Sequence, residues 1–164
     1  MSQQKVGFGG GCHWCTEAVF QALRGVVSVE QGFIRSTPPN QTWSEAVIVT
    51  FDEDVIDLKT LANVHVRTHA STARHSMRPK YRSAIYTFSD GQQVEANVVL
   101  ERLAGEFENG LVTEVLPYAG FKSSEVRHLN YYETNPDRPF CKRYIDPKLD
   151  LIRKKFSSQA LAAL

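Results

Sequence analysis

The change from a strand to a helix falls in residues 8–17, which read Phe8-Gly9-Gly10-Gly11-Cys12-His13-Trp14-Cys15-Thr16-Glu17. Residues 5–8 have the character of a short strand, three glycines allow a turn, and apolar residues at helical spacing follow from Cys12 to Leu23. Cys12 is therefore expected at the start of a helix, where exposed backbone N–H groups favour a thiolate. A buried core cysteine would not need three glycines before it, so the stretch predicts a nucleophilic sulfur.

The length and composition are those of one ordinary globular domain spanning residues 1–164. The chain has 164 residues, 42% hydrophobic and 23% charged, with a net charge of +1, so no global field attracts nucleic acid or an anionic membrane. No segment has the length of a membrane span, and the first residues lack the apolar core of a signal peptide. We therefore expect a cytoplasmic protein. Three cysteines are too few for a secreted disulfide framework, and a close pair in a reducing compartment indicates redox or metal chemistry.

Further elements follow the first helix in a mixed order. Strands are predicted at 26–33, 43–51, 81–88 and 112–116, and helices at 58–69, from about 92 to 107, at 124–133 and at 149–156. Residues 70–80 read as a polar loop, and the segment from about 135, with three prolines, reads as an irregular C-terminal tail before the last helix. This order predicts an α+β two-layer sandwich with a mainly antiparallel, mixed sheet and a ferredoxin-like core.

Glu45 is the carboxylate that the alternation of residues 43–51 places on the core side. Odd positions of this strand are the more apolar, so Glu45 is expected to point the same way as Val47 and Val49. An unpaired carboxylate there would have a raised pKa and could act as a general acid. The alternative is a glutamate that reaches solvent at the rim of the sheet.

Other candidate groups are two further cysteines and a tyrosine. Cys15 lies one helical turn after Cys12 and is either a partner for a disulfide or shared metal, or a packing residue. Cys141 lies in the proline-punctuated segment, and on a mobile tail it could reach another thiol. Tyr81 begins a predicted strand and could donate its hydroxyl to a ligand, or simply pack on the sheet.

Two alternative functions use the same cysteines. Cys12-His13-Trp14-Cys15 has the C-x-x-C form of thiol–disulfide oxidoreductases. His65 and His69 are four residues apart on one helix face and, with Cys12 and Cys15, could make a four-ligand zinc site in a non-enzymatic protein. The cysteine pair and the histidine pair are much farther apart in the sequence than the ligand pairs of a zinc finger, so a zinc site is less expected than redox chemistry. Two histidines packed on one helix face are the simpler interpretation. We therefore predict no metal.

Several motifs resemble, in order along nearly the whole chain, those of the A-type peptide methionine sulfoxide reductases. The signature Gly-Cys-Phe-Trp-Gly-x-Glu is similar to residues 11–17, and His-Ala-Glu-x-Val to residues 44–47 around Glu45. His69 matches the histidine of His-Asp-Pro-Thr, and residues 81–86 match Tyr-Arg-Ser-x-Ile-Tyr. Glu-x-x-His-Gln-x-Tyr resembles residues 125–131, and Asn-Pro with a nearby resolving cysteine resembles residues 135–141.

The resemblance implies thiol-dependent reduction of methionine sulfoxide, free or peptide-bound and of the S epimer, to methionine. Cys12 would attack the sulfoxide sulfur, Glu45 would protonate the departing oxygen, and Tyr81 would help to hold it. The resulting sulfenic acid on Cys12 would be resolved by a second cysteine, with Cys141 the first choice and Cys15 the second. An external reductant, thioredoxin or a similar protein, would restore the enzyme, with no bound cofactor and no nucleic-acid or membrane partner.

The chain also departs from the family pattern. His13 replaces the phenylalanine that, together with the residue matching Trp14, walls the pocket for the substrate methyl group, and Cys15 replaces a glycine. A second oxygen-binding tyrosine is unmatched between Phe33 and Glu45, and the aspartate of the loop before Tyr81 is absent. The resemblance therefore places this chain in a divergent branch, in which the reaction class transfers more safely than the substrate.

Overall fold

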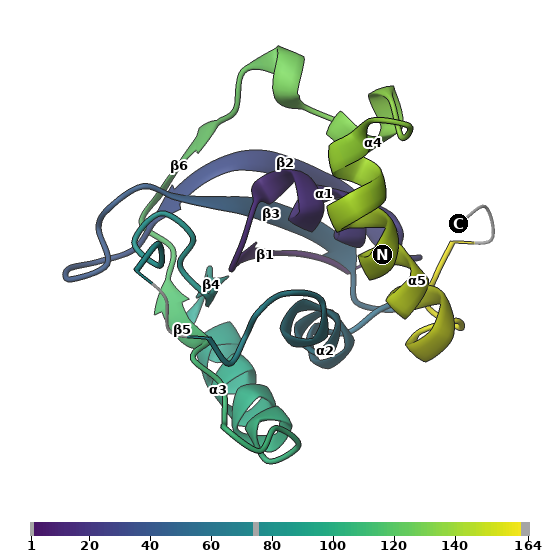
Figure 1. Ribbon diagram of the computed structural model, residues 1–164. Coiled ribbons are helices and arrows are strands. Elements are labelled where there is room, and N and C mark those ends of the chain that lie inside the picture. Colours follow the sequence, from purple (N-terminus) through teal and green to yellow (C-terminus); the bar gives the residue numbers. More distant parts are fainter. Residues whose placement is uncertain (1, 74–75, 162–164) are drawn as a thin grey trace.

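The computed structural model describes residues 2–73 and 76–161 (Figure 1). None of the helices in these two ranges is long and apolar enough to cross a membrane. The elements are β1 Gln3–Gly9, α1 His13–Gln21, β2 Val26–Arg35, β3 Ser44–Asp52, α2 Leu58–Thr68, β4 Ala84–Thr87, α3 Asp90–Ala104, β5 Glu114–Pro117, β6 Gly120–Ser123, the 3₁₀ helix η1 Val126–His128, α4 Tyr131–Thr134, the π-helix η2 Cys141–Ile145 and α5 Asp146–Lys155.

Six strands form one mixed sheet in the order β5-β4-β1-β3-β2-β6. Only β4 and β5 run parallel to each other, and every other neighbouring pair is antiparallel. The inner order β4-β1-β3-β2, with α1 after β1 and α2 after β3, is the ferredoxin-like arrangement. The predicted fold class is therefore confirmed.

The central strand β3 is covered on both faces. Val47, Val49 and Phe51 belong to the large core beneath the helices, while Ala46 and Ile48 belong to a smaller cluster on the opposite face. Burial of each large apolar side chain contributes roughly 1.5–3 kcal/mol to folding. The predicted alternation of side chains between the two faces of β3 is therefore present, and Glu45 lies on the face that the helices cover.

The C-terminal part differs from the sequence-based prediction. The expected helix at 124–133 is split because Asn130 has a left-handed backbone (φ 53°), and strand β6 precedes it. Residues 141–148, expected to be irregular before a helix at 149–156, are already helical and form η2 and the start of α5; η2 and α5 run beside α1 in Figure 1. Ile145, Leu149 and Ile152 are buried in the large core, and their burial holds this segment in place.

The region before β4 also differs. The strand predicted at 81–88 is shorter, because only Ala84–Thr87 pair with β1 and β5. Residues 70–80 form turns where a loop was predicted, apart from residues 74–75, which lie outside the described residues.

Candidate active site

Cys12 is the N-cap residue of α1 and is half-buried. Its carbonyl oxygen accepts hydrogen bonds from the backbone N–H groups of Cys15 (3.1 Å) and Thr16 (3.2 Å), which close the first turn. A hydrogen bond from the Cys15 thiol, assisted by the backbone N–H groups of Trp14 and Cys15, lowers the pKa of Cys12. Burial and the nearby charge of Glu45 oppose this shift. The Cys15 thiol, and to a smaller extent the backbone N–H groups at the helix start, therefore favour the thiolate of Cys12.

Cys15 is buried one turn later and has the opposite character. Its hydrogen bond to Cys12, its burial and the charge on Cys12 all raise the pKa of Cys15 far above its ordinary value. Of the two cysteines, Cys12 is therefore the one whose thiolate is favoured, while Cys15 keeps its proton.

The glycine turn packs closely against neighbouring backbone and side chains. A Cβ atom at Gly9 would lie 2.9 Å from the carbonyl oxygen of Arg82 and 3.1 Å from that of Glu45. A Cβ atom at Gly10 would lie 2.4 Å from the ring of His69. These two glycines therefore let the chain pass close to β3 and α2 and deliver Cys12 next to Glu45. Gly11 has open space around its Cα and carries no such requirement.

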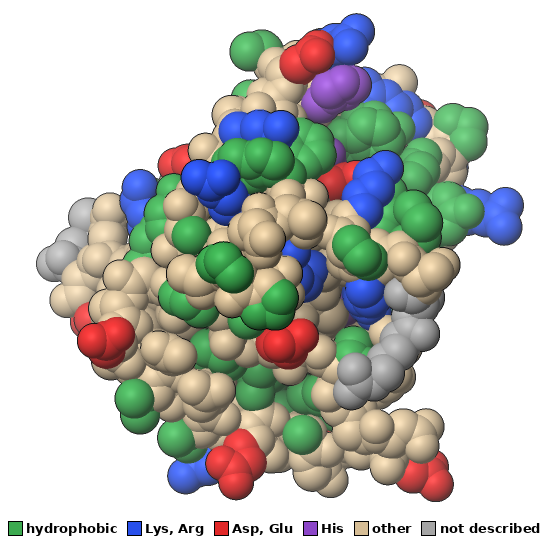
Figure 2. All heavy atoms as spheres, turned by 90° about the vertical axis from the view of Figure 1, so that its left-hand side faces the viewer, with side chains coloured by type: hydrophobic (Ala, Val, Ile, Leu, Met, Phe, Trp, Pro, Cys, Tyr) green, Lys and Arg blue, Asp and Glu red, His purple; other side chains and the backbone are tan. Residues whose placement is uncertain are grey.

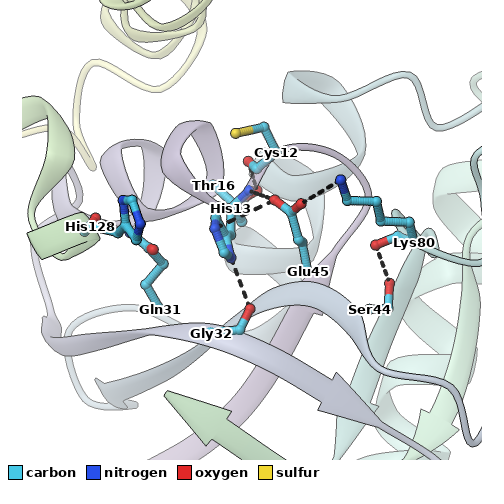
Figure 3. A network of polar contacts seen from close by, with 9 residues as sticks. All are labelled: Cys12, His13, Thr16, Gln31, Gly32, Ser44, Glu45, Lys80 and His128. Carbon is cyan, nitrogen blue, oxygen red and sulfur yellow. Dashed lines mark hydrogen bonds and ion pairs between the residues drawn. The ribbon is translucent and has the colours of Figure 1, made fainter. Parts of the chain in front are cut away.

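Glu45 is buried on the helix-facing side of β3, and its carboxylate is paired. The backbone N–H of His13 donates to Oε1 (3.2 Å), the imidazole Nε2 of His13 lies 3.5 Å from the same oxygen, and Lys80 Nζ lies 3.8 Å from Oε2. Figure 3 shows these three groups converging on the carboxylate. The expectation of an unpaired carboxylate is therefore wrong, because the helix N-terminus and Lys80 both reach it.

His13 is oriented by a second hydrogen bond. Its Nδ1 lies 2.9 Å from the carbonyl oxygen of Gly32, and since a carbonyl only accepts, Nδ1 carries a proton. Nε2 then faces Oε1 of Glu45, and this contact is attractive only when a proton resides on one of the two atoms. The imidazole and the carboxylate therefore face each other beside the start of α1.

Lys80 and Tyr81 reach the site because their backbone pairs with the start of β3. The carbonyl of Lys80 accepts from the Glu45 N–H (2.9 Å) and from the Ser44 hydroxyl (3.0 Å). Arg78 donates from Nη1 to the carbonyls of Tyr81 (2.9 Å) and Gly10 (3.0 Å), and so ties this segment to the glycine turn. Tyr81 is half-buried, and the Lys80 ammonium lies 5.2 Å from its ring centre. A hydrogen bond to Tyr81, the Tyr81 charge and Glu45 raise the pKa of Lys80.

Trp14 and His13 point in different directions from the first turn of α1. The Trp14 ring stacks on Tyr131 with ring centres 4.1 Å apart and an interplanar angle of 3°. The His13 ring packs edge-on to Phe33 at 5.3 Å. The two predicted wall residues of a methyl pocket therefore flank the helix start, with their ring centres 6.3 Å apart.

Cys141 is not on a mobile tail. It begins η2, has no exposed surface, and its thiol donates to the carbonyl oxygen of Asn135 (3.6 Å). Burial raises the pKa of Cys141, which disfavours its thiolate. The tail-cysteine interpretation is contradicted because the helix that follows it is anchored in the core.

A cavity of about 290 Å³ opens between α1, α2 and the C-terminal helices. Its lining includes Cys12 and Cys15 together with His65, His69 and Lys148. In Figure 3 the Cys12 sulfur points away from the Glu45 carboxylate, which agrees with the place of Cys12 on this cavity. Cys12 thus lies between the polar groups around Glu45 and a cavity that is also lined by Cys15.

Comparison with known proteins decides the family. A family profile described as peptide methionine sulfoxide reductase matches residues 4–160. This chain belongs to that family.

Individual relatives agree with this assignment. The peptide methionine sulfoxide reductase MsrA of Deinococcus radiodurans is 35% identical, covering 96% of this chain and 84% of the relative. Methionine sulfoxide reductase A of Corynebacterium diphtheriae superposes with a TM-score of 0.70 at 27% identity, covering 82% of this chain and 76% of that one. Mxr1 of Saccharomyces cerevisiae in complex with Trx2 superposes with a TM-score of 0.63 at 22% identity, covering 75% and 81%, and shows a shared fold.

The zinc alternative does not fit this methionine sulfoxide reductase. Within the described ranges, no three or more His, Cys, Asp or Glu side chains are grouped so that they could hold a metal ion. His65 Nε2 bonds to the Gly9 carbonyl (2.7 Å), and His69 Nε2 bonds to the Ser83 hydroxyl (2.8 Å). The histidine pair therefore supports the glycine turn and α2. The family assignment likewise favours sulfoxide reduction over general thiol–disulfide exchange.

Sequence reasoning missed two groups of the reductase site. Lys80 gave no signal except its place beside Tyr81, because its contact with Glu45 depends on the pairing of residues 44–45 with 80–82. Arg78 acts through backbone carbonyls, which leave no side-chain pattern in the sequence.

Proposed function

We propose that this chain reduces the S epimer of methionine sulfoxide to methionine, with Cys12 as the nucleophile. The observation that carries the proposal is a thiol with a lowered pKa at a helix start, next to a carboxylate surrounded by proton-bearing groups. A sulfoxide oxygen accepts hydrogen bonds, and the Lys80 ammonium, the Tyr81 hydroxyl and a protonated Glu45 are suited to supply them.

In the first step the Cys12 thiolate attacks the sulfoxide sulfur. Attack forms a bond between the Cys12 sulfur and the substrate sulfur, and the oxygen takes a proton from Glu45. The hydroxyl then passes to the Cys12 sulfur while both the sulfur–oxygen bond of the substrate and the new sulfur–sulfur bond break, so that methionine leaves and Cys12 carries a sulfenic acid. The sulfoxide sulfur is reduced by two electrons and the cysteine sulfur is oxidised by two. Because the Cys12 sulfur points away from the Glu45 carboxylate at rest, attack beside Glu45 requires rotation about the Cα–Cβ bond of Cys12.

We propose Cys15 as the residue that resolves the sulfenic acid. Side chains three residues apart on a helix have Cβ atoms about 5–6 Å apart, close to the roughly 4 Å that a disulfide needs. The Cys15 sulfur attacks the Cys12 sulfenic acid, a disulfide forms, and water leaves with the Cys15 proton. Cys141, the first choice from the resemblance, is buried and bonded to Asn135, so its use would require η2 to open.

The reductant is proposed to be a thioredoxin-type dithiol, by analogy with the Mxr1–Trx2 complex. The cavity beside Cys12 and Cys15 gives such a thiol a path to the disulfide, and no bound cofactor is needed. A reducing, cytoplasmic location suits this cycle and stays a prediction.

The test is NADPH oxidation coupled through thioredoxin reductase and thioredoxin, with the two separate epimers of a methionine sulfoxide peptide. The wild type should turn over the S epimer, and Cys12→Ser should not. Wild-type activity no higher than that of Cys12→Ser would overturn the proposal.

A further inference from the structure

Beyond Glu45, the helix-facing side of the sheet continues as an open surface. Phe33 pairs with Glu45 across β2 and β3, and Lys122 pairs with Phe33 across β6 and β2. Directly opposite residues of antiparallel strands project from the same face, so Lys122, Phe33 and Glu45 form one row across three strands. The row leads from Glu45 on β3 to the edge strand β6.

Two further side chains complete this surface. Trp43 precedes Glu45 by two positions and Arg35 follows Phe33 by two, which puts both on the same face. A Cβ atom at Gly120 would lie 3.1 Å from Arg35 Nε and 3.7 Å from the Trp43 ring, so both side chains cross over this glycine. We call Phe33, Arg35, Trp43 and Lys122 the cationic platform.

The cations of the platform lie on its aromatic rings. Arg35 Cζ is 5.0 Å from the Trp43 ring centre, and Lys122 Nζ is 4.9 Å from the Trp43 ring centre and 5.5 Å from that of Phe33. The rings hold the two charges in place without neutralising them. Figure 2 looks onto this side and shows Lys and Arg side chains lying among hydrophobic ones in its upper part.

The platform charge has no counter-ion in the described part of the chain. Arg35 and Lys122 are both exposed and make no ion pair there, whereas the neighbouring Glu125 is bonded to Arg127 (2.8 Å). Phe33 touches the His13 ring, so the platform is continuous with the site. An anionic group bound to the platform can therefore be part of the same substrate molecule whose sulfoxide lies beside Cys12 and Glu45.

We propose that the cationic platform binds acidic side chains that flank a methionine sulfoxide in a peptide, so that acidic segments are preferred substrates. This rests on the proposed function. Two strand spacings separate Glu45 from Lys122, about 10 Å. A side chain one or two residues along an extended peptide, at about 3.3 Å per residue, reaches across this separation of the backbones.

The experiment compares three peptides of equal length in which glutamate, glutamine or lysine flanks the methionine sulfoxide, with free methionine sulfoxide as a fourth substrate. For the wild type, kcat/KM should be highest for the glutamate peptide and lowest for the lysine peptide, and the difference should shrink as salt is added. Lys122→Gln and Arg35→Gln should each reduce the glutamate-to-glutamine ratio by about two- to fivefold. Lys122→Glu should lower this ratio further. The control Lys154→Gln, on exposed α5, should leave the ratio unchanged.

Equal kcat/KM for the three peptides would overturn the proposal while leaving the reductase function intact. A loss confined to free methionine sulfoxide in the two variants would also overturn it, by assigning the platform to the α-carboxylate. If no sulfoxide is turned over, the proposed function fails, and binding of the same fluorescently labelled peptides to Cys12→Ser protein still tests the platform. Tighter binding of the glutamate peptide would support it, and equal binding would overturn it.

Discussion

Cys12 and Cys15 show how two identical side chains acquire different chemistry from their positions in one helical turn. Cys12, at the N-cap, faces free backbone N–H groups, while Cys15 is enclosed and donates its proton to Cys12. The pattern of glycines and cysteines was sufficient to place Cys12 at the helix start, where its pKa is lowered. The pairing of Glu45 was not predictable, because Lys80 approaches it only after residues 80–82 pair with β3.

Removal of the Cys15 thiol should make Cys12 less acidic. In Cys15→Ala the main hydrogen bond to the Cys12 sulfur is lost, so its pKa should rise. The rate of Cys12 alkylation by iodoacetamide, followed against pH, measures this pKa directly. The midpoint should move to higher pH in Cys15→Ala and stay in place in Cys141→Ala. An unchanged midpoint in Cys15→Ala would show that Cys15 does not stabilise the thiolate.

Substitution of Glu45 by glutamine should separate thiol reactivity from turnover. Loss of the Glu45 charge removes a repulsion that raises the pKa of Cys12, so alkylation near neutral pH should be as fast or faster. Without a proton donor for the departing oxygen, sulfoxide turnover should fall by roughly 10²–10⁴-fold. Parallel losses in alkylation and turnover would instead indicate a disturbed helix start.

At the scale of elements, α1 is held between the sheet and the C-terminal segment. The buried Glu17 accepts hydrogen bonds from the backbone N–H groups of Asn130 (3.0 Å) and Tyr131 (3.1 Å), which ties α1 to the start of α4. This link also explains why the helix expected at 124–133 is interrupted. Asn130 breaks the expected helix at 124–133, and its left-handed backbone turns the next N–H toward Glu17.

Glu17→Ala should therefore loosen α4 and lower the free energy of unfolding by about 1–3 kcal/mol, since two backbone donors lose their acceptor. Urea denaturation followed by circular dichroism measures the change. The control Glu133→Ala removes an exposed carboxylate from α4 itself and should have little effect. Equal effects of the two substitutions would exclude the proposed link.

At the scale of the whole molecule, the periodic N-terminal half was predictable and the C-terminal third only in part. Strands and helices up to residue 107 have clear alternation or helical stripes, and β1 to β4 follow the expected core order. The three prolines and many charges after residue 135 hid η2 and the start of α5, although a helix was expected at 149–156; both elements are stabilised by burial of a few side chains such as Ile145 and Ile152. Tertiary burial overrides weak local signals in such segments.

Two neutral histidines beneath the glycine turn should make the fold sensitive to acid. Complete burial lowers the pKa of His65 to about 4, and burial also lowers the pKa of His69. In the unfolded chain these histidines take up protons around their ordinary pKa of about 6.5, whereas in the native state they stay neutral. The free energy of unfolding is therefore undiminished above about pH 6.5. It should decline toward pH 4 by up to about 1.4 kcal/mol per pH unit for His65 alone.

Urea unfolding at a series of pH values between 7 and 4.5 tests this, with the slope of stability against pH as the readout. His65→Gln, whose amide can still donate to the Gly9 carbonyl, should show a shallower slope than the wild type. His128→Gln, at a half-exposed position, serves as the control and should retain the wild-type slope. Identical slopes for the wild type and His65→Gln would contradict the assignment.

The pairing of Cys12 is tested most directly by mapping the disulfide that forms when reduced protein receives one equivalent of methionine sulfoxide. After alkylation of remaining thiols and proteolysis, mass spectrometry should find a Cys12–Cys15 link with Cys141 alkylated, in the wild type and in Cys141→Ser alike. A Cys12–Cys141 link in the wild type, or no disulfide at Cys12, would contradict the account.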